Sequence, residues 1–236
     1  MQRYFAKLET IDDVGQTIHA ACEMISDQGV LRQSYHVTPP FSESTSKDTS
    51  IYSRGFSREW MALYEQGDLR SKDPIPERIL AHGTMMTWQD AMARGRNTEE
   101  HLEYFATMRE HGLVHGFGVP LYGMSACDAY SAFDFGRPLD EVPEANLGLV
   151  RALAQAGHQR VCMLLNFSQK DYDLSEREKQ VLEWLARGKS IWAIAAILDL
   201  SPDTVKTYSR RLYAKLEVSD RVGAVVKALR LGLVRI

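Results

Sequence analysis

The sequence has few cysteines and no residue pattern typical of a bound metal. Cys22, Cys127 and Cys162 lie far apart, and neither a CxxC pair nor a zinc-type Cys/His spacing occurs. We therefore expect reduced, buried thiols. His111 and His115 are four residues apart, but the segment HGLVH lacks the glutamate of a zinc-protease motif and has a Gly where a metal-binding helix would run. No metal site and no cofactor are predicted.

The sequence also lacks a long apolar run. Its longest apolar stretches are short and interrupted by charges, whereas a membrane-spanning helix needs about 20 apolar residues. The N-terminal segment MQRYFAKLETIDD has neither the apolar core nor the cleavage site of a secretory signal. We expect a cytoplasmic protein that makes no membrane contact.

Charge is distributed unevenly along the chain. The net charge is −3, but residues 174–236 hold twelve Lys/Arg against seven Asp/Glu, a net of +5, while the rest of the chain has a net of −8. A basic segment attached to an acidic body indicates a polyanionic partner for the basic segment alone.

A polar stretch, NFSQKDYD, marks a domain boundary. It predicts a larger domain at residues 1–165, a linker at 166–173 and a smaller domain at 174–236. Residues 143–165 before it predict a long helix with small residues, Ala154 and Gly157, at the middle of its apolar stripe. Another helix could approach closely there, either within the same domain or across a dimer.

The larger domain mixes helix and strand patterns. Thr10 is expected to cap a helix that has Asp13 at its third position. In the last strand candidate, Ala129, Ser131 and Phe133 share one face. The strand candidates are VLRQSYHVT, TSIYS, FGVPLY and DAYSAFDF. This mixture predicts an α+β domain.

The smaller domain predicts four short helices from capping signals alone. Ser175 with Glu178 forms a capping box for the first, Ser190 caps the second, and Ser201 caps the third, with Pro202 at the first helical position. We expect Gly188 to end the first helix and Ser219 to begin the fourth, which ends near Gly232. The expected inner face of the second helix is Ile194, Ala195, Ile197 and Leu198.

The third of these helices presents a basic outer face. At 100° per residue, Val205, Leu212 and Leu216 point inward. The outward residues are Asp203, Lys206, Thr207, Arg210, Arg211 and Ala214. Such a helix, following a short turn and another helix, fits the DNA major groove. An ordinary solvated helix face is the alternative, and the net positive charge of the domain favours DNA binding.

The smaller domain resembles the LuxR-type helix-turn-helix. The resemblance rests on LSEREKQVLEWLARGKS, IAAILDLSPDTVKTYSRRLYAKL and VSDRVGAVVKALRLGLV, which cover essentially all of residues 174–236. It implies DNA contacts in which Lys206 and Arg210 read bases and the remaining cations hold the DNA backbone. The expected DNA-binding residues are Thr204, Lys206, Thr207, Arg210, Arg211 and Lys215.

The larger domain resembles the ligand-binding domain of the quorum-sensing LuxR regulators. The six residues that mark the family's pocket occur at the family's spacing: Trp60, Tyr64, Asp73, Pro74, Trp88 and Gly116. The resemblance therefore spans both domains. It implies an antiparallel sheet with helices on both faces, an α-β-α sandwich, and an N-acyl homoserine lactone as ligand.

The resemblance also implies a role for each pocket residue. The Trp60 indole would donate to the lactone carbonyl, the Tyr64 hydroxyl to the amide carbonyl, and the Asp73 carboxylate would accept the amide N–H. Trp88 would wall the lactone ring and Gly116 would leave space beside it. Ser131 would add a hydroxyl group. Each polar group of a buried neutral ligand needs such a partner.

Local structure alone explains part of the same stretch. Ser57 can cap a helix in which Trp60 and Tyr64 are a core pair, Gly67 can end it, and Asp73 with Pro74 can begin the next helix. This explanation gives no reason for Trp88 and Gly116 to stand at the family's positions. Two cations, Arg70 and Lys72, flank the expected site, and we expect both to point to solvent; an inward cation would suit a ligand with an additional acceptor or an anionic group.

These patterns predict a homodimeric transcription factor that is not an enzyme. Its expected partners are an acyl homoserine lactone, a two-fold-related DNA operator and RNA polymerase. One alternative is a regulator of the same fold that answers to a different small molecule or to none. A lactone-degrading enzyme is disfavoured because no metal cluster or Ser/His/Asp set is visible, and a phosphorylated receiver domain because no βα repetition occurs.

Overall fold

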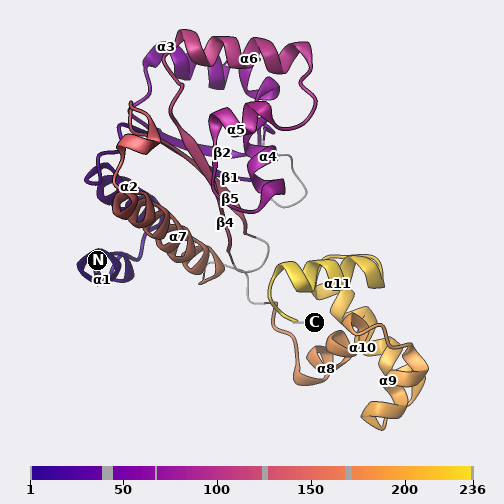
Figure 1. The fold of residues 1–236 in the computed structure, drawn as a ribbon. Coiled ribbons are helices and arrows are strands. Elements are labelled where there is room, and N and C mark those ends of the chain that lie inside the picture. Colours follow the sequence, from indigo (N-terminus) through magenta and orange to yellow (C-terminus); the bar gives the residue numbers. More distant parts are fainter. Residues whose placement is uncertain (1, 39–44, 67, 124–126, 168–171, 235–236) are drawn as a thin grey trace. The chain divides into compact units, whose positions relative to one another are not determined.

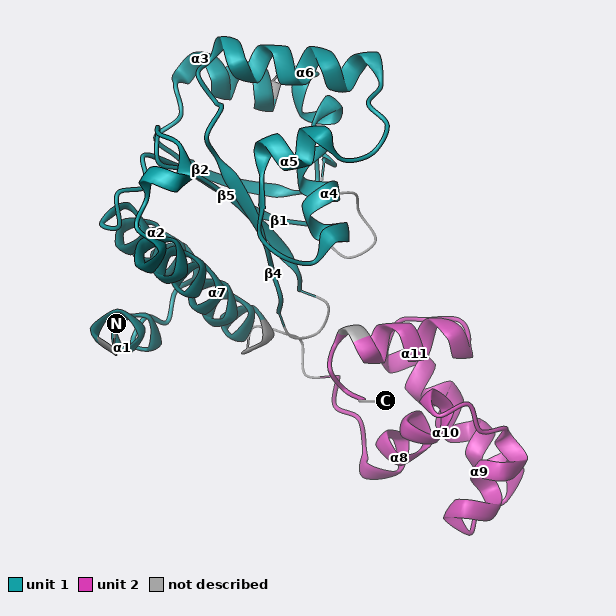
Figure 2. Ribbon diagram, in the orientation of Figure 1, with its two compact units in different colours: residues 1–165 teal, residues 166–236 magenta. Residues whose placement is uncertain are grey.

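The computed structural model describes residues 2–38, 45–66, 68–123, 127–167 and 172–234. The chain forms two compact units, residues 1–165 and 166–236 (Figure 2). The last helix of the larger unit continues to Phe167, inside the expected linker, and residues 168–171 of that linker lie outside the described residues. No helix in the described ranges is long and apolar enough to cross a membrane.

The larger unit is built on a five-stranded antiparallel sheet with the strand order β2-β1-β5-β4-β3 (Figure 1). All four strand candidates are present, and a short fifth strand extends one edge. The strands are β1 (Arg32–Val37), β2 (Ser50–Arg54), β3 (Met86–Thr87), β4 (Phe117–Leu121) and β5 (Ala129–Asp134). Every residue of β4 and β5 is buried, because both faces of the sheet are covered.

Helices cover the two faces of the sheet, which confirms the predicted α+β sandwich (Figure 1). One face carries α2 (Val14–Ser26) and the long helix α7 (Glu144–Phe167), with α1 (Gln2–Glu9) packed on α2 and a short 3₁₀ turn, η4 (Leu139–Glu141), before α7. The opposite face carries α3 (Arg58–Met61), its π-helical continuation η1 (Ala62–Gln66), the 3₁₀ turn η2 (Leu69–Lys72), α4 (Ile75–His82), α5 (Trp88–Ala93) and α6 (Glu99–Glu110). Each face has its own buried core.

The helix starts differ from expectation at two positions of this unit. Asp13, not Thr10, caps α2: its Oδ1 accepts the Gln16 N–H at 2.7 Å, while the Thr10 hydroxyl donates to the Lys7 carbonyl at the end of the preceding helix. Asp73 was expected as the N-cap of α4, but the cap position is Pro74 and the helix begins one residue later. The Ser57 cap is confirmed, and Gly67 lies outside the described residues.

The small residues of α7 allow α2 to approach within the same unit. A Cβ added at Gly157 would lie 2.8 Å from the Ala21 Cβ of α2, which is closer than side-chain contacts allow. Ala154 is buried in the same core. Packing inside the larger unit therefore explains the small-residue stripe.

The smaller unit contains α8 (Glu176–Ala186), α9 (Ile191–Leu198), α10 (Pro202–Lys215) and α11 (Arg221–Arg230). The caps Ser175, Ser190 and Ser201 are confirmed, but α11 is capped by Asp220 instead of Ser219. Its core is formed by the inward positions of the four helices. On α9 only Ile194 and Ala195 are buried; Ile197, expected inside, is 45% exposed because the short helix rests on the core along a narrow strip.

Candidate functional site

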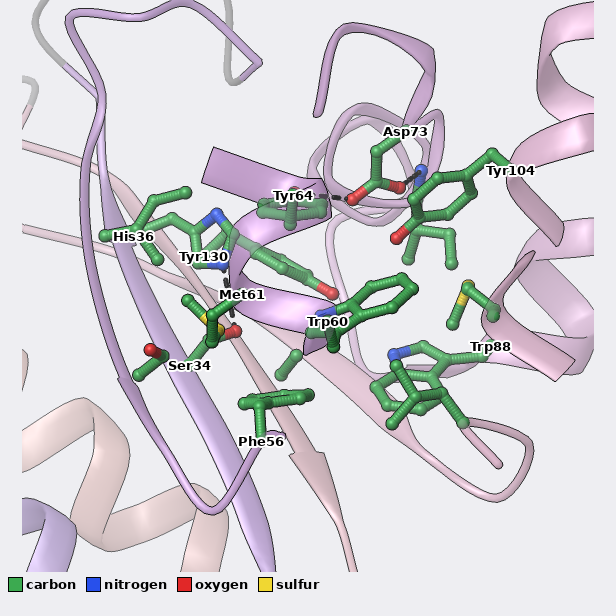
Figure 3. A pocket seen from close by; sticks show the side chains of 16 residues that line it. Ser34, His36, Phe56, Trp60, Met61, Tyr64, Asp73, Trp88, Tyr104 and Tyr130 are labelled. Atoms are coloured by element: carbon green, nitrogen blue, oxygen red, sulfur yellow. Dashed lines mark hydrogen bonds between the residues drawn. The ribbon is translucent and has the colours of Figure 1, made fainter. Parts of the chain in front are cut away.

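A cavity lies between the sheet and the helices α3 to α6 (Figure 3). Its free volume is about 40 Å³, so the side chains that line it lie close together. Four of the predicted site residues line it: Trp60, Tyr64, Asp73 and Trp88. They come from four different elements or turns, so the fold brings together residues that lie far apart in the sequence.

Trp60 and Tyr64 form one aromatic wall of this cavity. Both are buried, and their rings stack with centroids 5.8 Å apart and an interplanar angle of 24°. The helix that begins after the Ser57 cap changes to π-helical hydrogen bonding at Ala62, between these two aromatic residues. Single-turn π-helices of this kind are frequent at functional sites.

Asp73 places a buried carboxylate at the edge of the aromatic wall. Its Oδ2 accepts the Tyr64 hydroxyl at 2.7 Å and its Oδ1 accepts the Ile75 N–H at 2.9 Å, which secures the start of α4 (Figure 3). Burial raises the pKa of Asp73 to about 6, although the hydrogen bonds from Ile75, Tyr64 and Tyr104 act in the opposite direction. The carboxylate is therefore ionised at neutral pH but close to its titration range.

Trp88 and Gly116 fit against each other. The backbone N–H of Trp88 donates to the Gly116 carbonyl at 2.9 Å, and a Cβ on Gly116 would lie 2.4 Å from three atoms of the Trp88 ring. Gly116 therefore makes room for the indole, which is 3% exposed and lines the cavity. Pro74 is buried between Asp73 and the start of α4.

Ser131 does not reach this cavity. It pairs directly with Tyr35 in the β1–β5 ladder, and both lie on the face of the sheet covered by α2 and α7. Directly opposite residues in an antiparallel ladder share a face, so the neighbouring pair, His36 and Tyr130, points into the first cavity. The Ser131 hydroxyl therefore lies on the other face of the sheet, because one residue along a strand reverses the face.

Five polar lining residues were missed by the sequence reasoning: Ser34, His36, Ser53, Tyr104 and Tyr130. The alternation of Ser34 and His36 along β1 was visible in the sequence. This alternation does not indicate which face of the sheet the helices α3 to α6 cover.

The two flanking cations behave differently from each other. Lys72 pairs with Glu103 at 2.9 Å outside the cavity. Arg70 was expected to point to solvent, but it is partly buried, and its Nη2 donates to the carbonyls of Ser46 and Thr49 at 2.5 and 2.6 Å. The loop before β2 thus holds Arg70 inward, beside His36 and Tyr64, where its charge affects the pKa of both side chains.

In the smaller unit, α10 presents an exposed polar face. Lys206, Thr207, Arg210 and Arg211 are exposed, while Val205 and Leu212 are fully buried, as the helical spacing predicted. Lys206 contacts Asp203 at 3.0 Å, an exposed ion pair of small energetic value that can open easily.

Two other expected DNA-binding residues have partners inside the unit. The Lys215 ammonium group lies 2.8 Å from the Glu178 carboxylate and donates to the Asp173 carbonyl. The Thr204 hydroxyl bonds to Ser201, the cap of α10. Both residues stabilise the position of α10. The exposed cations Lys206, Arg210 and Arg211 are therefore the ones available to bind a partner.

No group of three or more His, Cys, Asp or Glu side chains within the described ranges could hold a metal ion. Cys127 and Cys162 are neighbours in space, with the Cys162 thiol 3.5 Å from the Cys127 carbonyl oxygen, although the two residues are far apart in sequence.

Known proteins match both units. The family model of the autoinducer binding domain matches residues 13–161, and that of the bacterial regulatory proteins of the luxR family matches residues 173–228. The quorum sensing-dependent transcriptional regulator RpaR of Rhodopseudomonas palustris is 32% identical over 184 residues, 77% of this chain and 74% of that protein. The transcriptional activator protein LuxR of Aliivibrio fischeri is 24% identical over 197 residues, 79% and 76% of the two chains.

The fold matches a solved structure along nearly the whole chain. SdiA of Escherichia coli superimposes with a TM-score of 0.72 at 21% identity, covering 98% of this chain and 96% of that one. The chain therefore belongs to the LuxR family of quorum-sensing transcriptional regulators, with an autoinducer-binding domain followed by a DNA-binding helix-turn-helix domain.

Proposed function

We propose that the cavity beside Asp73 binds an N-acyl homoserine lactone and that this ligand controls promoter binding by a homodimer. The observation that carries the proposal is a buried carboxylate, Asp73, in a cavity lined mainly by aromatic and aliphatic side chains. An ionised carboxylate is costly to bury without donors, and a neutral ligand with one amide N–H offers such a donor without adding charge.

The hydrogen bond between Tyr64 and Asp73 suggests how the ligand would enter. A ligand amide N–H would replace the Tyr64 hydroxyl at Asp73, and the released hydroxyl would donate to the amide carbonyl. The exchange keeps every buried polar group paired, as a stable complex requires. The Trp60 indole would donate to the lactone carbonyl, and Trp88, held by Gly116, would pack against the ring.

Thermal unfolding of the full chain with a panel of acyl homoserine lactones tests this proposal. A ligand at a hundred times its dissociation constant adds about 2.7 kcal/mol to the free energy of unfolding. The ring-opened acyl homoserine of equal chain length is the matched control, because it carries an additional carboxylate that Asp73 would repel. We expect stabilisation by a lactone and none by the ring-opened form. No shift with any chain length would favour a regulator that answers to a different molecule.

For the smaller unit, we propose that α10 enters the major groove of a two-fold-related operator. Its exposed cations, Lys206, Arg210 and Arg211, support this role, since long cationic side chains reach base edges and phosphates. Lys206 and Arg210 are assigned to bases, with Thr207 and Arg211 on the backbone. Binding to a two-fold operator and its half-site, compared in gel shifts, tests the dimer: a dimer loses most of its affinity when one half-site is removed.

A further inference from the structure

The wall of the cavity formed by β1 carries a polar atom that a plain alkyl chain would leave unpaired. His36 is buried, 4% exposed, and lines the cavity. Its Nε2 lies 2.9 Å from the Ser34 hydroxyl, while its Nδ1 is buried and has no hydrogen-bond partner among the described residues. Figure 3 shows the ring between Ser34, Tyr64 and Tyr130.

The tyrosine neighbours of His36 present ring surfaces to it. Tyr130 packs edge-on at 5.1 Å between ring centroids, and Tyr64 at 6.3 Å. The Tyr64 hydroxyl is engaged with Asp73. These two rings therefore hold the imidazole in place and exclude solvent, and the Ser34 bond fixes which edge of the ring faces the strand.

A second unpaired nitrogen belongs to Arg70. Its Nη2 holds two backbone carbonyls, but its Nε is buried without a hydrogen-bond partner in the described part of the chain. Burial, with a further contribution from the Arg70 charge, lowers the pKa of His36 to about 3, so the imidazole is neutral at pH 7. The charge of Arg70 thus acts on His36, and each of the two side chains has a buried nitrogen without a hydrogen-bond partner in the described part of the chain.

A neutral imidazole can serve an oxygen atom in either tautomer. If the Ser34 hydroxyl donates to Nε2, then Nδ1 carries the proton and donates; if Nε2 donates to Ser34, then Nδ1 accepts. A hydroxyl group satisfies both forms, and a keto group satisfies the first. An alkyl chain satisfies neither, and an unpaired buried polar group weakens binding.

We propose that the acyl group of the ligand carries an oxygen substituent, hydroxyl or keto, that hydrogen-bonds His36 Nδ1. This inference rests on the proposed lactone site and names the class of lactone that the site selects. His36 is the residue that determines this preference, while Asp73 and Trp60 hold the head group common to all lactones.

Isothermal titration of the full chain with matched lactones tests the proposal. The ligands share an octanoyl chain that is plain, carries a hydroxyl or keto group on its third carbon, or carries a hydroxyl group at its far end. We expect at least one oxygenated chain to bind about tenfold more tightly than the plain chain, which corresponds to about 1.4 kcal/mol. In His36→Leu this preference should vanish while the plain chain binds as well as before or better.

A control variant separates the polar contact from cavity shape. Ile51→Val trims the same cavity without removing a polar atom, so it should change the affinity for all four ligands by the same factor and keep the preference. Equal binding of plain and oxygenated chains by the wild-type protein would overturn the inference and leave the lactone site standing, as would a preference that persists in His36→Leu. If none of the lactones binds, the proposed function fails and the inference fails with it.

Discussion

Asp73 uses its two carboxylate oxygens for different purposes. Oδ1 accepts the first free N–H of α4, and Oδ2 accepts the Tyr64 hydroxyl inside the cavity. Its structural role and its proposed binding role therefore coexist, and a substitution that preserves shape can separate them. Asparagine keeps an oxygen for Ile75 but loses the negative charge that would attract the ligand amide.

Asp73→Asn should weaken lactone binding at pH 7 by about 1.5–3 kcal/mol, the usual worth of a hydrogen bond to a charged group. The free energy of unfolding of the ligand-free protein should not fall at pH 7, because the α4 contact survives and a buried charge is removed. Calorimetric titration and urea unfolding measure the two quantities. Unchanged affinity would leave Asp73 with its structural role alone.

Titration of Asp73 should make both ligand affinity and ligand-free stability depend on pH. The ionised carboxylate is the better acceptor, so wild-type affinity should rise with pH up to the pKa of about 6 and be constant above it. Ligand-free stability changes in the opposite direction: the pKa lies above its ordinary value of 3.8, so stability falls as pH rises from about 4 to about 6. Affinity that is flat from pH 5 to 7.5 would contradict this, and Asp73→Asn should be flat in any case.

A substitution at Gly116 tests whether this glycine is needed to hold the Trp88 ring in place. Gly116→Ala places a methyl group 2.4 Å from the indole, so the ring must move, and we expect a loss of about 1–3 kcal/mol in the free energy of unfolding together with weaker ligand binding. Gly148→Ala is the control, since no atom lies within 4 Å of its added Cβ on the exposed side of α7. It should be neutral or stabilise the protein by about 0.4–1 kcal/mol. Equal effects of the two variants would exclude a special role for Gly116.

Among the elements, capped helices could be predicted from the sequence, and strand orientation could not. Ser57, Ser175, Ser190 and Ser201 each cap a helix through a contact three residues away, so the signal is local. The predictions at Thr10 and Ser219 were wrong because a second capping residue, Asp13 or Asp220, stands nearby and its side chain accepts the N–H three residues on.

The cavity was predictable only in part for the same reason. Trp60, Tyr64, Asp73 and Trp88 were predicted from the resemblance to the family's pocket. The placement of His36 in this cavity and of Ser131 on the opposite face depends on which face of the sheet α3 to α6 cover, which is a long-range property. Arg70 turns inward because two backbone carbonyls of a distant loop hold it, and nothing in its neighbouring sequence indicated this.

On α10, the adjacent residues Arg210 and Arg211 are expected to make different kinds of DNA contact. Arg210→Ala should cost about 1–3 kcal/mol on the operator and relax specificity at one position of each half-site, because a base contact is lost. Arg211→Ala should weaken operator and random DNA equally, as a phosphate contact does. Gel shifts with both DNAs measure the ratio, and an unchanged ratio in Arg210→Ala would make it a backbone contact.

For the whole molecule, sensing and DNA binding must be coupled in both directions. If the lactone changes operator affinity by some factor, the operator must change lactone affinity by the same factor. Lactone titrations with and without operator DNA, beside DNA titrations with and without lactone, provide the two factors at one salt concentration. Independent binding of the two ligands would contradict ligand control of promoter binding.

The central claim is that the ligand binds in the cavity beside Asp73. A crystal structure of the full chain with a bound lactone tests this claim most directly. We predict the lactone ring beside Trp88, the amide between Tyr64 and Asp73, and the acyl chain along β1 toward His36. A ligand on the other face of the sheet, between α2, α7 and Ser131, would contradict the account.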